Sequence, residues 1–121
     1  MNKVKSGNLN NLVNEHPETK NWVVGHFIKH DDFLRTDDLE VKWAVHKKGD
    51  IKDGNLADYS AKTLGILIKG KFIIKFPDIN EEVVLSETGD YITYDNGELN
   101  HTAEALEDTI ILTIRWPSRP K

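Results

Sequence analysis

The sequence predicts an all-β fold, either a sandwich or a barrel of about eight short strands. Runs rich in β-branched and aromatic residues recur at spacings of ~8–12 residues from residue 22 onward. Residues that favour turns separate these runs, and no helical pattern lies between them. The clearest strand is residues 39–46, in which Val41, Trp43 and Val45 alternate with polar or small residues.

The first 20 residues are predicted to form an arm or one short helix. Apolar residues are spaced there as in an amphipathic turn, with Ser6 or Asn8 as the N-cap. Pro17 is expected to end the turn. The arm is expected to lie over the barrel or over a partner subunit.

The other elements follow from turn chemistry and alternation. Residues 63–68 and 72–76 flank Gly70 and predict a tight hairpin, because glycine tolerates a positive φ. Residues 47–59 are rich in glycine, asparagine and aspartate and predict a loop. The remaining expected strands are residues 22–28, 83–85, 91–94, 101–106 and 109–116.

Composition limits the classes of partner. The chain has 121 residues and no cysteine, which excludes disulfides, thiolate metal ligands and a cysteine nucleophile. Its formal net charge of −4 gives no broad attraction for nucleic acid or anionic lipid. It has no apolar run long enough for a membrane helix or a signal peptide. We expect a cytoplasmic protein with an arm (1–20), one β-domain (21–117) and a tail (118–121).

One segment carries a family resemblance. Gly89-Asp90 opens a predicted strand, a turn at Asn96-Gly97 follows, and His101 comes next. This order resembles the second motif of the cupin superfamily, although Asp95 stands where proline is usual and His101 comes one residue late. The hairpin around Gly70 resembles the end of the first cupin motif. The resemblance covers about residues 21–116 and implies a cupin-like jelly-roll barrel.

The first cupin motif departs from the metal-binding pattern. Metal-binding cupins carry a His-x-His pair and then a Glu ahead of the closing hairpin. Counting back from Gly70, the Glu position falls on Thr63. Only His101 transfers directly as a ligand, and His46, at the end of a neighbouring strand, is the candidate substitute.

Three histidines on three predicted strands are the candidate metal ligands: His26, His46 and His101. If they converge, they suit one divalent transition metal, namely iron, manganese, nickel or zinc. His46 and His101 are also the candidate catalytic acid–base residues. The alternative is that His26 and His46 are ordinary strand histidines.

A second set of residues is expected to bind a ligand. Lys42 lies on the polar face of its strand, which either lines the barrel or faces solvent. Arg115 has the same two alternatives, and an inward arginine implies an anionic ligand. Tyr59 and Tyr91 are candidate hydroxyl donors. Tyr91 and Tyr94 are expected on opposite faces of one strand, so at most one of them points inward.

Three functions remain open from the sequence. The first is a small cupin-like protein that binds a small polar molecule in the barrel, with or without a divalent metal. The second is a cupin-type lyase, isomerase or dioxygenase that uses His46 or His101. The third is a non-catalytic structural or regulatory module. The resemblance also implies a homodimer, since many cupins pair through edge strands.

Overall fold

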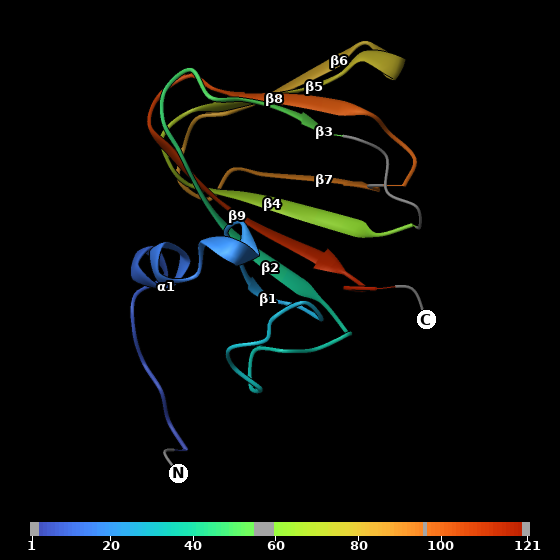
Figure 1. The fold of residues 1–121 in the computed structure, drawn as a ribbon. Coiled ribbons are helices and arrows are strands. Elements are labelled where there is room, and N and C mark those ends of the chain that lie inside the picture. The colour runs from blue at the N-terminus through green and yellow to red at the C-terminus, as the bar shows by residue number, and fades with distance from the viewer. Residues whose placement is uncertain (1–2, 55–59, 96, 120–121) are drawn as a thin grey trace.

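The computed structural model describes residues 3–54, 60–95 and 97–119, and these fold into two antiparallel sheets that face each other (Figure 1). One sheet has the strand order β1-β2-β9-β4-β7 and the other β3-β8-β5-β6. The sheets form a two-layer jelly roll rather than one continuous barrel. The strands are β1 Trp22–Val24, β2 Glu40–His46, β3 Ile51–Gly54, β4 Lys62–Lys69, β5 Phe72–Phe76, β6 Glu81–Leu85, β7 Tyr91–Asp95, β8 His101–Ala105 and β9 Thr109–Trp116.

The N-terminal arm contains one helix, α1 Leu9–Glu15, as the sequence predicts. The side chain of Asn8 caps it by accepting hydrogen bonds from the backbone N–H groups of Asn10 and Asn11. Val13 is the buried residue of the helix, and α1 packs on β1 and β2. The Trp43 indole donates to the Asn10 side chain at 2.7 Å, which ties the helix to the outer face of β2. Short 3-10 helices follow at Pro17–Thr19 and Pro77–Ile79.

The hairpin between β4 and β5 forms around Gly70, as expected, with a φ of +98°. A Cβ at this position would collide with the carbonyl oxygen of Asp108 and with Thr109, so the turn needs glycine for space as well as for conformation. The hairpin places β4 in one sheet and β5 in the other. The chain therefore crosses between the two layers at Gly70.

Two predicted boundaries differ from the structure. The first strand ends at Val24 rather than at residue 28, because the backbone of Gly25 pairs with Leu34 and Thr36 of the loop that follows. The predicted loop at residues 47–59 contains β3, which pairs with β8. β3 pairs with residues that are 47 to 53 positions away in the sequence, so its pairing depends on tertiary context.

The hydrophobic core lies between the two sheets. It contains Leu67, Phe72, Ile74, Phe76, Leu85, Ile92, Ala103, Ala105 and Ile111. The last strand continues into a segment whose first polar residue, Ser118, is fully buried. Within the described part of the chain, no helix is long and apolar enough to cross a membrane. The homodimer stays a prediction.

Candidate functional site

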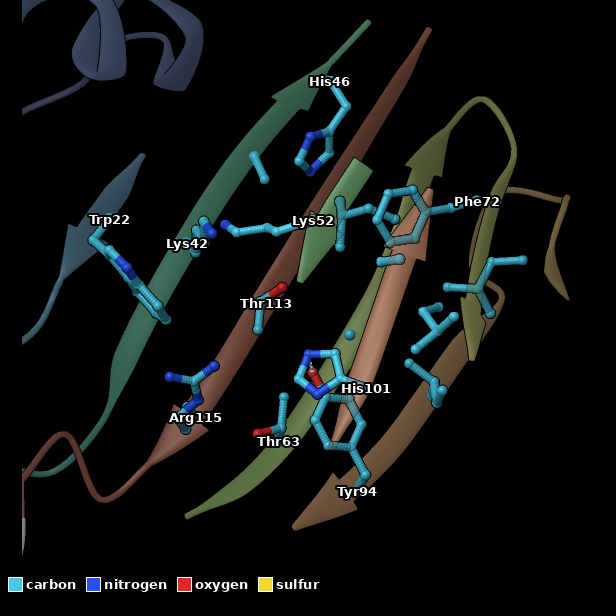
Figure 2. Close-up of a pocket in the computed structure, with 17 residues that line it drawn as sticks. Trp22, Lys42, His46, Lys52, Thr63, Phe72, Tyr94, His101, Thr113 and Arg115 are labelled. Carbon is cyan, nitrogen blue, oxygen red and sulfur yellow. Dashed lines mark hydrogen bonds between the residues drawn. The ribbon is translucent and has the colours of Figure 1, made fainter. Parts of the chain in front are cut away.

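A cavity of about 310 Å³ opens between the two sheets and is lined from all nine strands described above (Figure 2). Its inner wall is apolar and comes from core residues such as Phe72, Ile74 and Ile111. Basic and hydroxyl side chains occupy the rest of the lining. No carboxylate is among the described residues that line it.

The register of the larger sheet brings distant polar residues into rows across the cavity wall. One row joins Arg115 of β9 to Thr63 of β4 and then to Tyr94 of β7. The neighbouring row joins Trp22 to Lys42 and then to Thr113. All six of these residues line the cavity, because alternate residues of a strand face the same side of the sheet.

Gly65 opens space in the second row. It pairs with Thr113 on one side and Ile92 on the other. A Cβ at Gly65 would lie 3.2 Å from Cγ2 of Ile92, so a larger side chain would both crowd that isoleucine and fill the cavity. The absent side chain therefore helps to define the volume available to a ligand.

Arg115 is anchored by a buried acid. Its Nη1 donates to Oε1 of Glu40 at 3.2 Å, and the Glu40 side chain is 5% exposed. The Ser118 hydroxyl donates to the other Glu40 oxygen at 3.3 Å. Burial raises the pKa of Glu40, while the Arg115 charge opposes that rise. The guanidinium also lies over the Trp22 ring, 5.2 Å from its centroid.

Lys42 brings a second cation over the same indole. Its Nζ lies 5.6 Å from the centroid of the Trp22 ring. Burial, which is the largest cause, acts together with the adjacent Lys52 and the charge of Arg115 to lower the pKa of the Lys42 ammonium to about 7. Figure 2 shows the Lys42 and Lys52 amines side by side in the cavity. The site thus concentrates positive charge.

The two cavity histidines are biased toward their neutral forms. Burial is the main cause that lowers the pKa of His46, and Lys52 and Lys42 add to it, whereas Asp50 opposes it. Burial also lowers the pKa of His101; the neighbouring Leu99 backbone opposes this, and the charges of Arg115 and Lys52 add to it. His46 stacks on Phe72 with ring centroids 5.3 Å apart. The Nε2 of His101 lies 3.4 Å from the Tyr94 hydroxyl.

Three buried polar atoms that line the cavity make no hydrogen bond with the described residues: Thr63 Oγ1, His101 Nδ1 and Arg115 Nε. These are the only such side-chain atoms in the described part of the chain. Buried polar groups in native proteins are nearly always paired, because an unpaired one costs about 1–3 kcal/mol. Their gathering in one cavity marks it as a place for a polar ligand.

The structure brings together four of the predicted site residues: Lys42, His46, His101 and Arg115 all line the cavity. The polar face of β2 therefore faces inward. His26 lies outside the lining, where its Nδ1 is 2.7 Å from the Ser118 hydroxyl. The three histidines do not converge.

The tyrosines differ from the predicted set. Tyr91 is 66% exposed and points away from the cavity, and Tyr94, on the other face of the same strand, lines it. Tyr59 lies outside the described residues. Sequence reasoning missed Lys52 and Thr63 as site residues. Lys52 falls in the segment expected to be a loop, so no periodic signal marked it.

The charges of the described cavity lining disfavour a divalent-metal centre. No group of three or more histidine, aspartate or glutamate side chains in the described ranges is placed to hold a metal ion. His46 and His101 lie at opposite ends of the cavity (Figure 2). Lys42, Lys52 and Arg115 share the space between the sheets with them, and their charges oppose a second cation. Thr63 stands where the family resemblance places the acidic ligand.

Comparisons with known proteins bear on the fold. No protein-family model and no curated protein sequence matches the chain. KdgF from Halomonas sp. superimposes with a TM-score of 0.58 at 23% identity, over 69% of this chain and 74% of KdgF. An RmlC-like cupin protein from Desulfovibrio desulfuricans gives a TM-score of 0.60 at 12% identity, over 74% and 89% of the two chains.

A third structure covers the whole chain. The conserved SPY1581 protein of unknown function from Streptococcus pyogenes gives a TM-score of 0.60 at 17% identity, over 100% of this chain and 92% of that one. These likenesses confirm the cupin-like jelly-roll fold predicted from residues 89–101 and the hairpin at Gly70. The fold hosts many unrelated functions, so the site must carry the functional argument.

Proposed function

We propose that this protein binds a small anionic molecule, with a carboxylate or similar acid group, in the cavity between its sheets. The observation that carries the proposal is the lining itself: three basic side chains, Lys42, Lys52 and Arg115, and no described carboxylate. Arg115 supports the proposal further, because its Nε has no hydrogen-bond partner among the described residues while its Nη1 donates to Glu40. Because the Glu40 contact fixes the orientation of the guanidinium, its other N–H groups can donate to a planar acid group.

The other lining groups suit the rest of a small polar molecule. Thr63 Oγ1 is buried beside Arg115 in the sheet register and offers both a donor and an acceptor. The Trp22 ring and the apolar inner wall offer surface to a carbon skeleton. The metal predicted from the sequence stays a prediction, to be tested by elemental analysis of protein purified without a chelator. Catalysis by His46 or His101 also stays a prediction.

Isothermal titration calorimetry with sulfate and with lactate tests the proposal, with glycerol as a neutral probe. We expect both anions to bind, glycerol not to bind, and affinity to fall as ionic strength rises. Lys52→Met should weaken anion binding at least several-fold. The matched control is Lys62→Met, which removes an exposed lysine from the outward-facing side of β4 and should leave binding unchanged.

A pair of substitutions at Thr63 separates charge from size. Thr63→Glu places a carboxylate opposite Arg115 and should abolish anion binding, because it occupies the guanidinium. Thr63→Gln adds nearly the same volume without charge and should reduce binding less. Equal losses in the two variants, or glycerol binding as tightly as lactate, would contradict the proposal.

A further inference from the structure

Two amines meet in the cavity from opposite sheets. Lys42 comes from β2 of the larger sheet and Lys52 from β3 of the smaller one. Figure 2 shows the two side-chain nitrogens next to each other, and they are close enough to share a hydrogen bond. Lys42 is partly buried and Lys52 is exposed. A half-buried amine beside a second cation is the setting in which lysine becomes a nucleophile.

We propose that Lys42 forms a reversible imine with the carbonyl carbon of a small oxo acid whose carboxylate Arg115 holds. This inference rests on the proposed function, because the same guanidinium binds the acid group. It adds a covalent step and a substrate class: an acid that carries an aldehyde or ketone within a few carbons of its carboxylate.

The positions of the two basic groups suit such a molecule. Lys42 and Arg115 lie in adjacent rows of the sheet, so their Cα positions are about 7 Å apart along the strand direction. The Lys42 Nζ and the Arg115 Cζ lie 5.6 and 5.2 Å from the centroid of the same Trp22 ring. In the proposed complex a short oxo acid places its carboxylate on Arg115 and its carbonyl carbon toward Lys42.

The surroundings keep part of Lys42 unprotonated. Its pKa of about 7 makes roughly half of the amine neutral at neutral pH. The titratable groups that line the cavity with it are Lys52, Arg115, His101 and Tyr94 from other strands and His46 from its own strand. Two are cations, and burial lowers the pKa of both histidines and raises that of Tyr94, so these three are biased toward neutral forms. No described carboxylate lines the cavity to restore the charge of Lys42.

The step balances without an oxidant or a reductant. The lone pair of the neutral Lys42 nitrogen forms the C–N bond while the π electrons of the C=O group move to oxygen. Protons pass from nitrogen and from solvent to that oxygen, which leaves as water. The product is a protonated imine, so the net reaction joins the lysine ammonium and the oxo acid with loss of one water.

Reductive trapping tests the inference. The full chain is incubated with pyruvate and sodium cyanoborohydride, and the modified residue is located by peptide mass spectrometry. We expect one dominant adduct, on Lys42, whose yield saturates with pyruvate and falls when lactate competes. Lys42→Arg keeps the charge and should lose this adduct. Lys62→Arg removes an exposed amine and should leave the adduct unchanged.

The pH profile gives a readout that random lysine modification does not share. Trapping at Lys42 should rise through about pH 7 as the amine loses its proton. Lys52→Met removes the neighbouring charge, so the midpoint of that rise should move upward by on the order of one pH unit. Exposed lysines should react only at much higher pH. Circular dichroism of each variant confirms that it is folded.

The results separate this inference from the proposed function. If lactate and sulfate bind but wild-type protein and Lys42→Arg trap pyruvate equally, the imine is refuted and anion binding stands. If adducts spread over exposed lysines with no preference for Lys42, the imine is also refuted. If neither lactate nor sulfate binds and no adduct forms on Lys42, both proposals fail.

Discussion

Replacing Arg115 by methionine should destabilise the fold by about 3 kcal/mol, because the change leaves the Glu40 carboxylate buried without a charged partner. Glu40 is 4% exposed, and Nη1 of Arg115 is 3.2 Å from its Oε1. Breaking a buried ion pair from one side costs about 3–5 kcal/mol. The lower end applies here, because the Arg115 side chain is 21% exposed and Ser118 still donates to the other Glu40 oxygen.

For a domain of this length, 1 kcal/mol corresponds to about 3–4 °C in Tm, so the expected fall is about 10 °C. Differential scanning calorimetry at pH 7 measures it. The matched control is Arg35→Met, which breaks an ion pair with Asp32 whose side chains are 47% and 87% exposed. An exposed pair contributes at most about 1 kcal/mol, so this control should lose no more than about 3–4 °C.

The pH dependence follows from the raised pKa of Glu40. Without Arg115 the pKa of Glu40 rises further. When the pKa of a carboxyl group is higher in the folded state than in the unfolded state, the protein loses stability as the pH rises from the unfolded pKa toward the folded pKa. The deficit of Arg115→Met should therefore be smaller near pH 4.5 than at pH 7. The double variant Glu40→Gln/Arg115→Met should recover most of the loss at pH 7. A single variant as mild as Arg35→Met, or a double variant no better than the single, would refute this reasoning.

Three further changes have expected outcomes. Gly65→Val should abolish lactate binding in calorimetry while Tm falls by only a few degrees, because the new side chain fills the cavity and displaces Ile92 slightly. Lys42→Met should raise Tm, and by more at pH 6 than at pH 10. Burying the charged Lys42 ammonium destabilises the folded state, and this destabilisation decreases as the pH rises from the folded pKa of about 7 toward the higher pKa of lysine in the unfolded chain. Gly70→Ala should lower the free energy of unfolding in urea by about 2 kcal/mol or more, because its φ is +98° and a Cβ meets the Asp108 backbone.

The alternation in residues 39–46 predicts β2 but does not determine which face is inside. Ala44 is 3% exposed and lies on the polar face, whereas Val45 on the apolar face is 49% exposed. A polar cavity wall has the same two-residue period as a wet exterior. The outer face of β2 is covered in part by α1, through the bond from Trp43 to Asn10, and the sequence of the strand carries no sign of that cover.

Lys52 shows a different limit of sequence reasoning. It lies on β3, a strand of four residues that is set by its pairing with β8 rather than by local propensity. Turn-forming residues surround it in sequence, so the segment has the composition of a loop. Tyr94 was missed for a simpler reason: a strand places Tyr91 and Tyr94 on opposite faces, and only the tertiary structure decides between them.

Thr63 links the weak metal motif to the basic cavity. It stands where the cupin resemblance places an acidic ligand, and the register sets it directly beside Arg115. A glutamate there would place a second carboxylate beside the guanidinium, which already contacts Glu40, and would oppose the anion binding proposed above. Under the proposed function, a few inward positions set the sign of the charge that the cavity accepts, whereas the strands and the turn at Gly70 set the fold.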